Sequence, residues 1–145
     1  LSARISNPYG PGQDLNKGGG FIDAAIKKTI RSEKIEIWGD GNNVRDYIYI
    51  DDFVSAFYAL FNCINLPYNI FNIGSGYGVS TIKIIETILE LTDSSDIKKK
   101  YIDIHRSLIP SNILCNQRLI DVIGPYSITP LTEGISAFIK STMKS

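Results

Sequence analysis

The first stretch whose residue types suit ligand binding runs from Arg4 to Gln13 and reads RISNPYGPGQ. Two prolines and two glycines fix a tight backbone path, which leaves backbone amides free to face a ligand. Asn7 can both donate and accept hydrogen bonds, so it suits a phosphate or a sugar oxygen. An ordinary surface turn explains the stretch equally well when it is taken alone.

The second stretch, residues 35–52, reads IEIWGDGNNVRDYIYIDD and places Arg45 just after a glycine-rich turn. A guanidinium group at the start of a strand can grip a phosphate with two parallel hydrogen bonds. Trp38, at the end of the preceding strand, is placed to lie against a planar base. The alternative interpretation pairs Arg45 with Asp46 or Asp52 and puts Trp38 in the core.

Two further stretches are weaker candidates. Residues 72–80 read NIGSGYGVS, which is not the GxGxxG pattern of a dinucleotide loop, so we interpret them as a tight strand-to-helix turn with Ser80 as helix cap. His105 is the only histidine, and no Ser/His/Asp arrangement surrounds it, so a surface role is favoured. Arg106 is a candidate second phosphate ligand.

Hydrophobic periodicity predicts the helices and strands that position these residues. Apolar residues at helical spacing predict a helix over 21–33, another after Asp51 or Asp52, a third from Ser80, a fourth near 116–123 and a last one from about Pro130. Short strands are predicted at 1–6, 35–38, 45–50, 69–73 and 100–104, with a turn-rich loop over 7–12. The expected fold is a mixed α/β domain with short strands and ligand-binding loops.

Composition narrows the class of protein. The 145 residues fit one domain, and fifteen basic residues balance fifteen acidic ones, so neither nucleic acid nor an anionic membrane is an expected partner. No apolar run reaches the roughly 20 residues that span a bilayer, and the first residues do not resemble a signal peptide, so a cytoplasmic location is expected. Cys63 and Cys115 have no metal-ligand spacing, so neither a metal site nor a disulfide is expected.

In their order and spacing, SNPYGPGQ, IWGDGNNVRDYIYIDD and FNIGSGYGVS resemble the C-terminal part of extended short-chain dehydrogenases/reductases. Bacterial UDP-glucose 4-epimerases of the NAD-dependent epimerase/dehydratase family are the subgroup that the chain is most similar to, over nearly its whole length. In that family an N-terminal Rossmann-fold half binds NAD, and the C-terminal half closes over a nucleotide diphosphate sugar. The resemblance implies that residues 1–145 are a single substrate-binding domain, and that the Rossmann half is missing from this chain.

The resemblance also implies roles for individual residues. Asn7 would contact the diphosphate and sugar, and Arg45 the diphosphate. Ile35 to Trp38 would line the base, and Tyr9 lies in a loop that passes near NAD in relatives. The stretch from Arg106 to Pro110 is one residue shorter than the family pattern, which leaves the register of Arg106 open.

The family's catalytic Tyr-x-x-x-Lys pair is not found, because none of the eight tyrosines is followed four residues later by lysine. The resemblance therefore predicts no catalytic residue in this chain, no tight binding of NAD to it and no turnover by it alone. A homodimer is expected only of the full-length parent. The alternating residues Leu1, Ala3 and Ile5 resemble a strand cut from something longer.

Three hypotheses about function remain open at this point. The leading one is that the chain is the UDP-sugar-binding part of an NAD-dependent UDP-glucose/UDP-galactose 4-epimerase. The second keeps the fold and changes the parent reaction to that of a nucleotide-sugar 4,6-dehydratase or decarboxylase. The third is a non-catalytic nucleotide-binding module.

Overall fold

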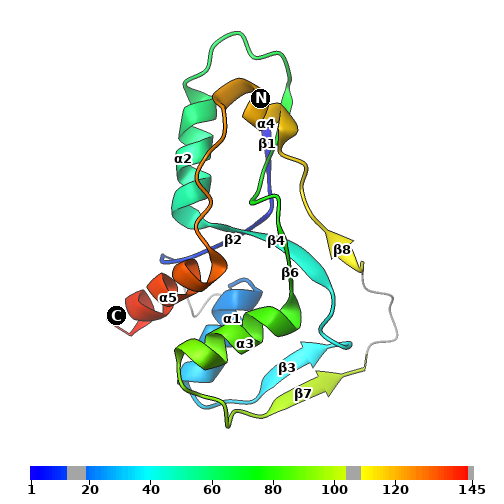
Figure 1. Ribbon diagram of the computed structural model, residues 1–145, viewed down its shortest axis with the longest axis vertical. Coiled ribbons are helices and arrows are strands. Elements are labelled where there is room, and N and C mark those ends of the chain that lie inside the picture. Colours follow the sequence, from blue (N-terminus) through cyan, green and yellow to red (C-terminus); the bar gives the residue numbers. More distant parts are fainter. Residues whose placement is uncertain (13–18, 104–108, 144–145) are drawn as a thin grey trace.

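A computed structural model describes residues 1–12, 19–103 and 109–143 of the chain, and it is a mixed α/β fold with parallel strands. In chain order the elements are β1 (Ser2–Ile5), β2 (Asn7–Tyr9), α1 (Phe21–Ile30), β3 (Ile35–Trp38), β4 (Val44–Tyr49), α2 (Ile50–Phe61), β5 (Ile70–Ile73), β6 (Gly78–Ser80), α3 (Thr81–Leu91), β7 (Lys99–Ile102), β8 (Ser111–Asn112), α4 (Gln117–Ile123) and α5 (Leu131–Thr142). Figure 1 shows an elongated molecule in which β4 and β6 link an upper part to a lower part.

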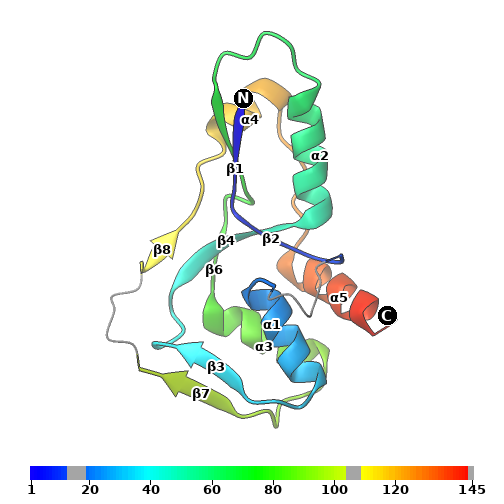
Figure 2. The same cartoon turned by 180° about the vertical axis from the view of Figure 1, so that it is seen from behind.

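The upper part contains the parallel pair β1 and β5, with α2 and α4 beside it (Figures 1 and 2). Because paired residues of neighbouring strands share a face, Ala3 and Phe71 point to the same side. That side packs on α2 and α4 in a hydrophobic cluster with Ala56, Leu60 and Leu119. The chain begins beside α4, at this end of the molecule.

One prediction from the sequence, the loop at residues 7–12 in the middle of the molecule, is wrong in part. Asn7–Tyr9 was predicted to be part of a turn-rich loop, but it forms strand β2, which pairs in parallel with Tyr47–Tyr49 of β4. A proline is tolerated there because β2 lies at the edge of its sheet. β4 also pairs with β6 and β8, so it is the strand around which the site is built.

The lower part holds α1, α3 and α5 around a second hydrophobic cluster that includes Ile26, Ile88 and Phe138. Strand β3 pairs in parallel with β7, and its buried residues Ile35 and Ile37 pack on α3 in a third cluster. Ser80 caps α3 as predicted, because its Oγ accepts a hydrogen bond from the backbone N–H of Lys83 at 3.3 Å.

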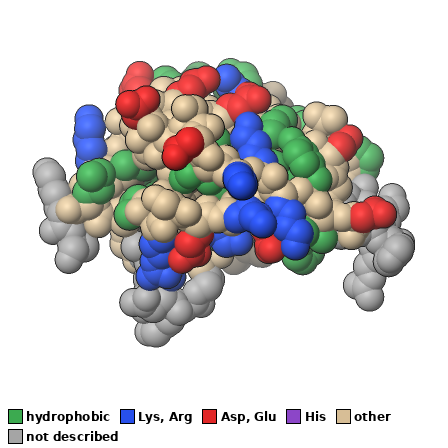
Figure 3. Space-filling model, turned by 90° about the horizontal axis from the view of Figure 1, so that it is seen from below, with side chains coloured by type: hydrophobic (Ala, Val, Ile, Leu, Met, Phe, Trp, Pro, Cys, Tyr) green, Lys and Arg blue, Asp and Glu red, His purple; other side chains and the backbone are tan. Residues whose placement is uncertain are grey.

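The surface of the lower end, seen from below in Figure 3, carries Lys and Arg side chains together with Asp and Glu. Such a mixed surface is typical of a solvated face rather than of an extended basic patch. Within the described residues, Cys63 and Cys115 are both free, and no group of His, Cys, Asp and Glu could hold a metal ion. None of the described helices has the length and hydropathy needed to cross a membrane.

Candidate functional site

A cavity of about 320 Å³ brings together three of the residues that the sequence singled out, Asn7, Trp38 and Arg45. These come from β2, β3 and β4, which are three separate strands. The remaining walls are formed by Phe21, Glu36, Asn43, Tyr47 and Thr81. The cavity therefore combines a cation, a carboxylate, two amides, hydroxyl groups and aromatic rings.

Trp38 is 62% exposed, so the indole is not a core residue. Side chains alternate along β3, with Ile35 and Ile37 buried and Glu36 and Trp38 on the open face. An exposed tryptophan at the wall of a cavity offers a flat apolar surface to a ligand. The interpretation that placed Trp38 in the core is wrong.

Arg45 is held in the cavity by backbone carbonyls. Its Nη1 donates to the carbonyl oxygens of Val44 at 2.7 Å and of Ile109 at 2.8 Å. Neither of the ion pairs seen among the described residues, Lys28–Glu36 and Arg31–Glu33, involves Arg45. A half-buried guanidinium without a counter-charge is suited to bind an anion.

Strand alternation explains why Arg45 does not pair with its neighbour Asp46. The two side chains point to opposite faces of β4, and Asp46 is buried. Its Oδ1 accepts from the backbone N–H and the Oγ of Ser75, at 2.8 and 2.7 Å. Its Oδ2 accepts from the N–H groups of Gly76 and Leu114, both at 3.2 Å. Asp46 thus ties the glycine loop and the segment after β8 to the back of β4.

The glycine loop therefore has a structural function. A Cβ atom at Gly74 would lie 2.5 Å from Asp46 Oδ2, so the glycine is required by the close approach of the carboxylate. With the carboxylate occupying the loop, the backbone amides of Ser75 and Gly76 cannot receive a diphosphate. The loop does not fit a dinucleotide, in agreement with the sequence-based interpretation.

Strand β4 also orients Asn7. Its Nδ2 donates to the backbone oxygen of Asp46 at 2.7 Å, which fixes the plane of the amide at the cavity wall. Tyr47, two residues after Arg45, shares the open face of β4. Burial raises the pKa of Tyr47, partly offset by the nearby charge of Arg45, so its phenol stays protonated at neutral pH.

Tyr9, the predicted cofactor contact, lies in the hydrophobic cluster beneath α5. Its ring packs edge-on against Tyr49, and its hydroxyl lies so close to Gly134 that a Cβ atom there would be 2.3 Å away. Burial, with the negative charge of Asp52 next in effect, raises the pKa of Tyr9. Packing alone accounts for the tyrosine, and its contact with a cofactor stays a prediction.

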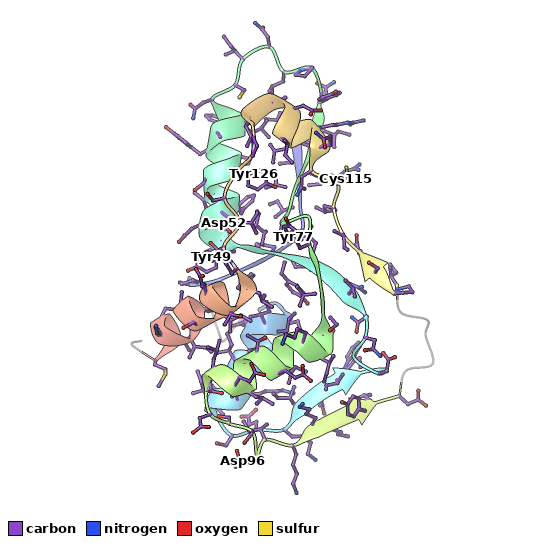
Figure 4. The ribbon with its side chains drawn as sticks, viewed as in Figure 1. Tyr49, Asp52, Tyr77, Asp96, Cys115 and Tyr126 are labelled. Atoms are coloured by element: carbon purple, nitrogen blue, oxygen red, sulfur yellow. The ribbon has the colours of Figure 1, made fainter. Side chains whose placement is uncertain are left out.

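Asp52, at the start of α2, holds the segment that leads to α5 (Figure 4). Its carboxylate accepts hydrogen bonds from the backbone N–H of Thr129 at 2.6 Å and from the Thr129 hydroxyl at 2.9 Å. Tyr126 anchors the same segment by donating from its hydroxyl to the backbone oxygen of Gly74 at 2.5 Å. Asp52 therefore positions α5 and does not pair with Arg45.

Ile35 and Arg106 are the two other binding residues that the sequence predicts. The side chain of Ile35 is buried against α3 and Ile35 is not among the residues that line the cavity, so its contact with a ligand stays a prediction. Arg106, like His105, lies outside the described residues. Glu36, which falls within the predicted stretch Ile35 to Trp38 but was not singled out, does line the cavity, and it shares the open face of β3 with Trp38.

Comparisons with known proteins place this geometry in a family context. A model of the NAD dependent epimerase/dehydratase family matches residues 1–74. dTDP-4-dehydro-6-deoxyglucose reductase from Escherichia coli is 36% identical over 149 residues, which cover 97% of this chain and 44% of the reductase.

Solved structures of similar proteins share the fold of this chain. A UDP-glucose 4-epimerase from Thermotoga maritima with UDP-glucose has a TM-score of 0.85 and 28% identity, covering 98% of this chain and 45% of the epimerase. The protein MoeE5 in complex with UDP-glucose and NAD has a TM-score of 0.83 and 28% identity, covering 98% and 46% of the two chains. The chain therefore spans less than half the length of the proteins it matches.

Proposed function

Because this chain belongs to the NAD-dependent epimerase/dehydratase family, we propose that it binds the nucleoside diphosphate part of a nucleotide sugar in the cavity shared by Asn7, Trp38 and Arg45. Its relatives are nucleotide-sugar epimerases, dehydratases and reductases. In the proposal Arg45 binds the diphosphate, Trp38 stacks on the base, and Asn7 contacts the diphosphate and the adjoining sugar. The observation that carries it is that the guanidinium of Arg45, which pairs with no described carboxylate, lines the same cavity as an exposed indole.

We further propose that this chain is the substrate-binding part of a longer parent protein whose other half carries out the chemistry. NAD would be bound, and the hydride and proton transferred, by a Rossmann-fold half outside these 145 residues. Two features support this. The pair β1–β5 is only two strands wide, and parallel sheets are normally wider and covered on both faces. In addition, α2 exposes a row of apolar side chains, Val54, Phe57, Tyr58 and Phe61.

For the parent reaction we propose a UDP-sugar 4-epimerase, consistent with the likeness to the Thermotoga maritima enzyme. The 36% identity to the dTDP-sugar reductase over nearly the whole chain favours a second candidate, reduction of a dTDP-4-dehydro sugar. Assays of the full-length parent separate the two. The first predicts interconversion of UDP-glucose and UDP-galactose without net use of a reductant, and the second predicts oxidation of a reduced nicotinamide by the dTDP-4-dehydro sugar.

The binding proposal is tested on the chain itself by calorimetry with UDP, dTDP and uridine. We expect binding of UDP or dTDP, and a loss of about tenfold or more in that affinity for Arg45→Ala, because a charge-assisted contact to phosphate contributes about 1.5–3 kcal/mol. Arg45→Lys should lose less, since it keeps the charge but not the two parallel hydrogen bonds.

Two controls separate phosphate recognition from damage to the fold. Uridine, which has no phosphate, should bind the Arg45→Ala variant as it binds the unchanged chain. Arg31→Ala removes an arginine that pairs with Glu33 on the surface, away from the cavity, and should leave UDP binding intact. The proposal fails if the unchanged chain binds neither UDP nor dTDP at millimolar concentration.

A further inference from the structure

A separate cavity of about 470 Å³ lies beside the segment that leads into α5. Its described walls come from β2, β4, β6, the glycine loop and residues 126–131, and it has one of them, Tyr47, in common with the cavity of Arg45 and Trp38. Four of the eight tyrosines of the chain line this tyrosine cavity, namely Tyr9, Tyr47, Tyr77 and Tyr126. The cavity therefore offers aromatic rings from four different segments to a ligand.

Hydrogen bonds fix the ring or the backbone of two of these tyrosines, Tyr126 and Tyr77 (Figure 4). Tyr126 donates from its hydroxyl to the backbone oxygen of Gly74 at 2.5 Å. The backbone N–H of Tyr77 donates to Ser75 Oγ at 3.1 Å, and Ser75 is itself bonded to Asp46. Tyr77 is nevertheless 69% exposed, so the fold covers little of its side chain. A well-anchored loop thus holds an aromatic ring at the cavity, where it is accessible to a ligand.

Two carboxylates lie directly behind the walls of the tyrosine cavity. Asp46 accepts hydrogen bonds from Ser75, and Asp52 accepts them from Thr129. Ser75 and Thr129 both line the cavity. Burial raises the pKa of Tyr126, and the negative charges of Asp46 and Asp52 act in the same direction. The two carboxylates therefore give the cavity a negative potential.

The positive charges around the tyrosine cavity do not cancel this potential. Burial raises the pKa of Tyr47, which lines both cavities, and the charge of Arg45 partly offsets the rise. Arg45 has no such effect on the pKa of Tyr126. The N-terminal end of α5 reaches the cavity at Leu131 and carries about half a positive elementary charge. Glu133 in the first turn of α5 opposes that half charge, so the negative charge prevails.

The lining restricts the ligand to an organic cation. None of the described residues that line the tyrosine cavity is charged, so an anion finds no partner there. A metal ion needs several ligand atoms in direct contact, and the described residues contain no group of His, Cys, Asp and Glu that could hold one. An ammonium group bonded to carbon needs no such ligands, because the faces of aromatic rings attract it. Apolar side chains at the same cavity, Val79, Ile128 and Leu131, suit its carbon skeleton.

We propose that the tyrosine cavity binds an organic ammonium ion, with the positive nitrogen against the ring of Tyr77 and the neighbouring tyrosine rings. The negative potential from Asp46 and Asp52 strengthens this attraction without direct contact. The site is distinct from the proposed nucleotide site, so it stands or falls independently of nucleotide-sugar binding.

Choline is a suitable probe, because it carries a methylated ammonium group on a short carbon chain. The control ligand is the uncharged alcohol in which a carbon atom replaces the choline nitrogen. In a titration followed by proton NMR, the N-methyl signals of choline should shift upfield to saturation, since aromatic rings lie against them. The chain should bind choline about fivefold or more tightly than it binds the uncharged alcohol.

Substitutions of Tyr77 test the site itself, and the exposure of this residue allows them without damage to the core. Tyr77→Ala should weaken choline binding about fivefold, whereas Tyr77→Phe, which keeps the ring, should stay within about twofold of the unchanged chain. Tyr58→Ala is the matched control, because Tyr58 on α2 is 68% exposed and lies outside the cavity. It should leave choline binding unchanged.

The proposal is overturned if choline binds no more tightly than the uncharged alcohol, or if its signals show no saturable shift. Equal losses for Tyr77→Ala and Tyr58→Ala would likewise overturn it, because binding would then not be at this cavity. A loss for Tyr77→Phe as large as for Tyr77→Ala would show that the hydroxyl and not the ring holds the ligand, which contradicts the proposal. A selective loss for Tyr77→Ala supports it.

Discussion

Two neighbouring residues of opposite charge, Arg45 and Asp46, serve different purposes because they lie on opposite faces of β4. Arg45 points to the open cavity, where backbone carbonyls hold it and no described carboxylate neutralises it. Asp46 is buried and accepts four hydrogen bonds from Ser75, Gly76 and Leu114. One residue is available to a ligand, and the other holds the surrounding loops in place.

Replacing Asp46 by asparagine tests this structural role. The amide turns an N–H group toward donors that need an acceptor, so we expect the free energy of unfolding to fall by about 2–4 kcal/mol. Urea denaturation followed by circular dichroism measures the change. The exposed Asp121→Asn variant should unfold at the same urea concentration as the unchanged chain. A loss below about 0.5 kcal/mol for Asp46→Asn would contradict the assigned role.

At the residue scale, the residues that line the cavity could be predicted from the sequence better than the residues that support them. Asn7, Trp38 and Arg45 stand out because amide, indole and guanidinium groups beside glycine-rich turns are typical of ligand sites. The partners of Asp46 come from segments that are far from it in the chain. No local pattern contains that information.

Among the elements, α2 has two different faces. One face packs on β1 and β5 through Ala56 and Leu60, while the other exposes Tyr58 and Phe61, which are 68% and 69% accessible. Apolar residues at a spacing of three to four on an exposed helical face mark a surface that is covered in the working protein. We propose that a Rossmann-fold half of the longer parent covers this face.

The exposed face of α2 predicts that the isolated chain self-associates as its concentration rises. Phe61→Lys should reduce this association several-fold, as measured by light scattering, since it places a charge on the apolar row. A lysine is also favourable at the C-terminal end of a helix, so α2 itself should not be weakened. Met143→Lys changes an equally exposed apolar residue elsewhere and is the control. Equal effects of the two substitutions would argue against a specific apolar face.

The helices could be predicted from the sequence because their apolar periodicity is local, and for α3 because the cap Ser80 is local as well. All five helices lie close to where apolar spacing predicts them. However, α1 ends at Ile30 and not at residue 33, and α2 begins at Ile50, before the Asp51 or Asp52 that was predicted to precede it. The short strands β2, β6 and β8 were not predicted. Each is two or three residues long and owes its conformation to pairing with β4, which is distant in sequence.

At the scale of the whole molecule, the cavity lined by Asn7, Trp38 and Arg45 borders the hydrophobic clusters, and its walls come from the middle and the lower part of the fold. β2 and β4 belong to the middle of the molecule, while α1, β3 and α3 belong to the lower part (Figures 1 and 2). The clusters fix these elements, and the polar residues between them remain accessible. This arrangement suits a ligand with an anionic end and a flat aromatic end.

The central claim is that the cavity binds a nucleoside diphosphate between Arg45 and Trp38, and the fluorescence of Trp38 tests it most directly. Trp38 is the only tryptophan of the chain and it lines the cavity, so its emission reports on this site alone when tyrosine is not excited. Titration with UDP or dTDP should quench the emission to saturation, and Arg45→Ala should shift the midpoint to about tenfold or higher concentration. An emission that neither nucleotide changes, up to millimolar concentration, would contradict the account.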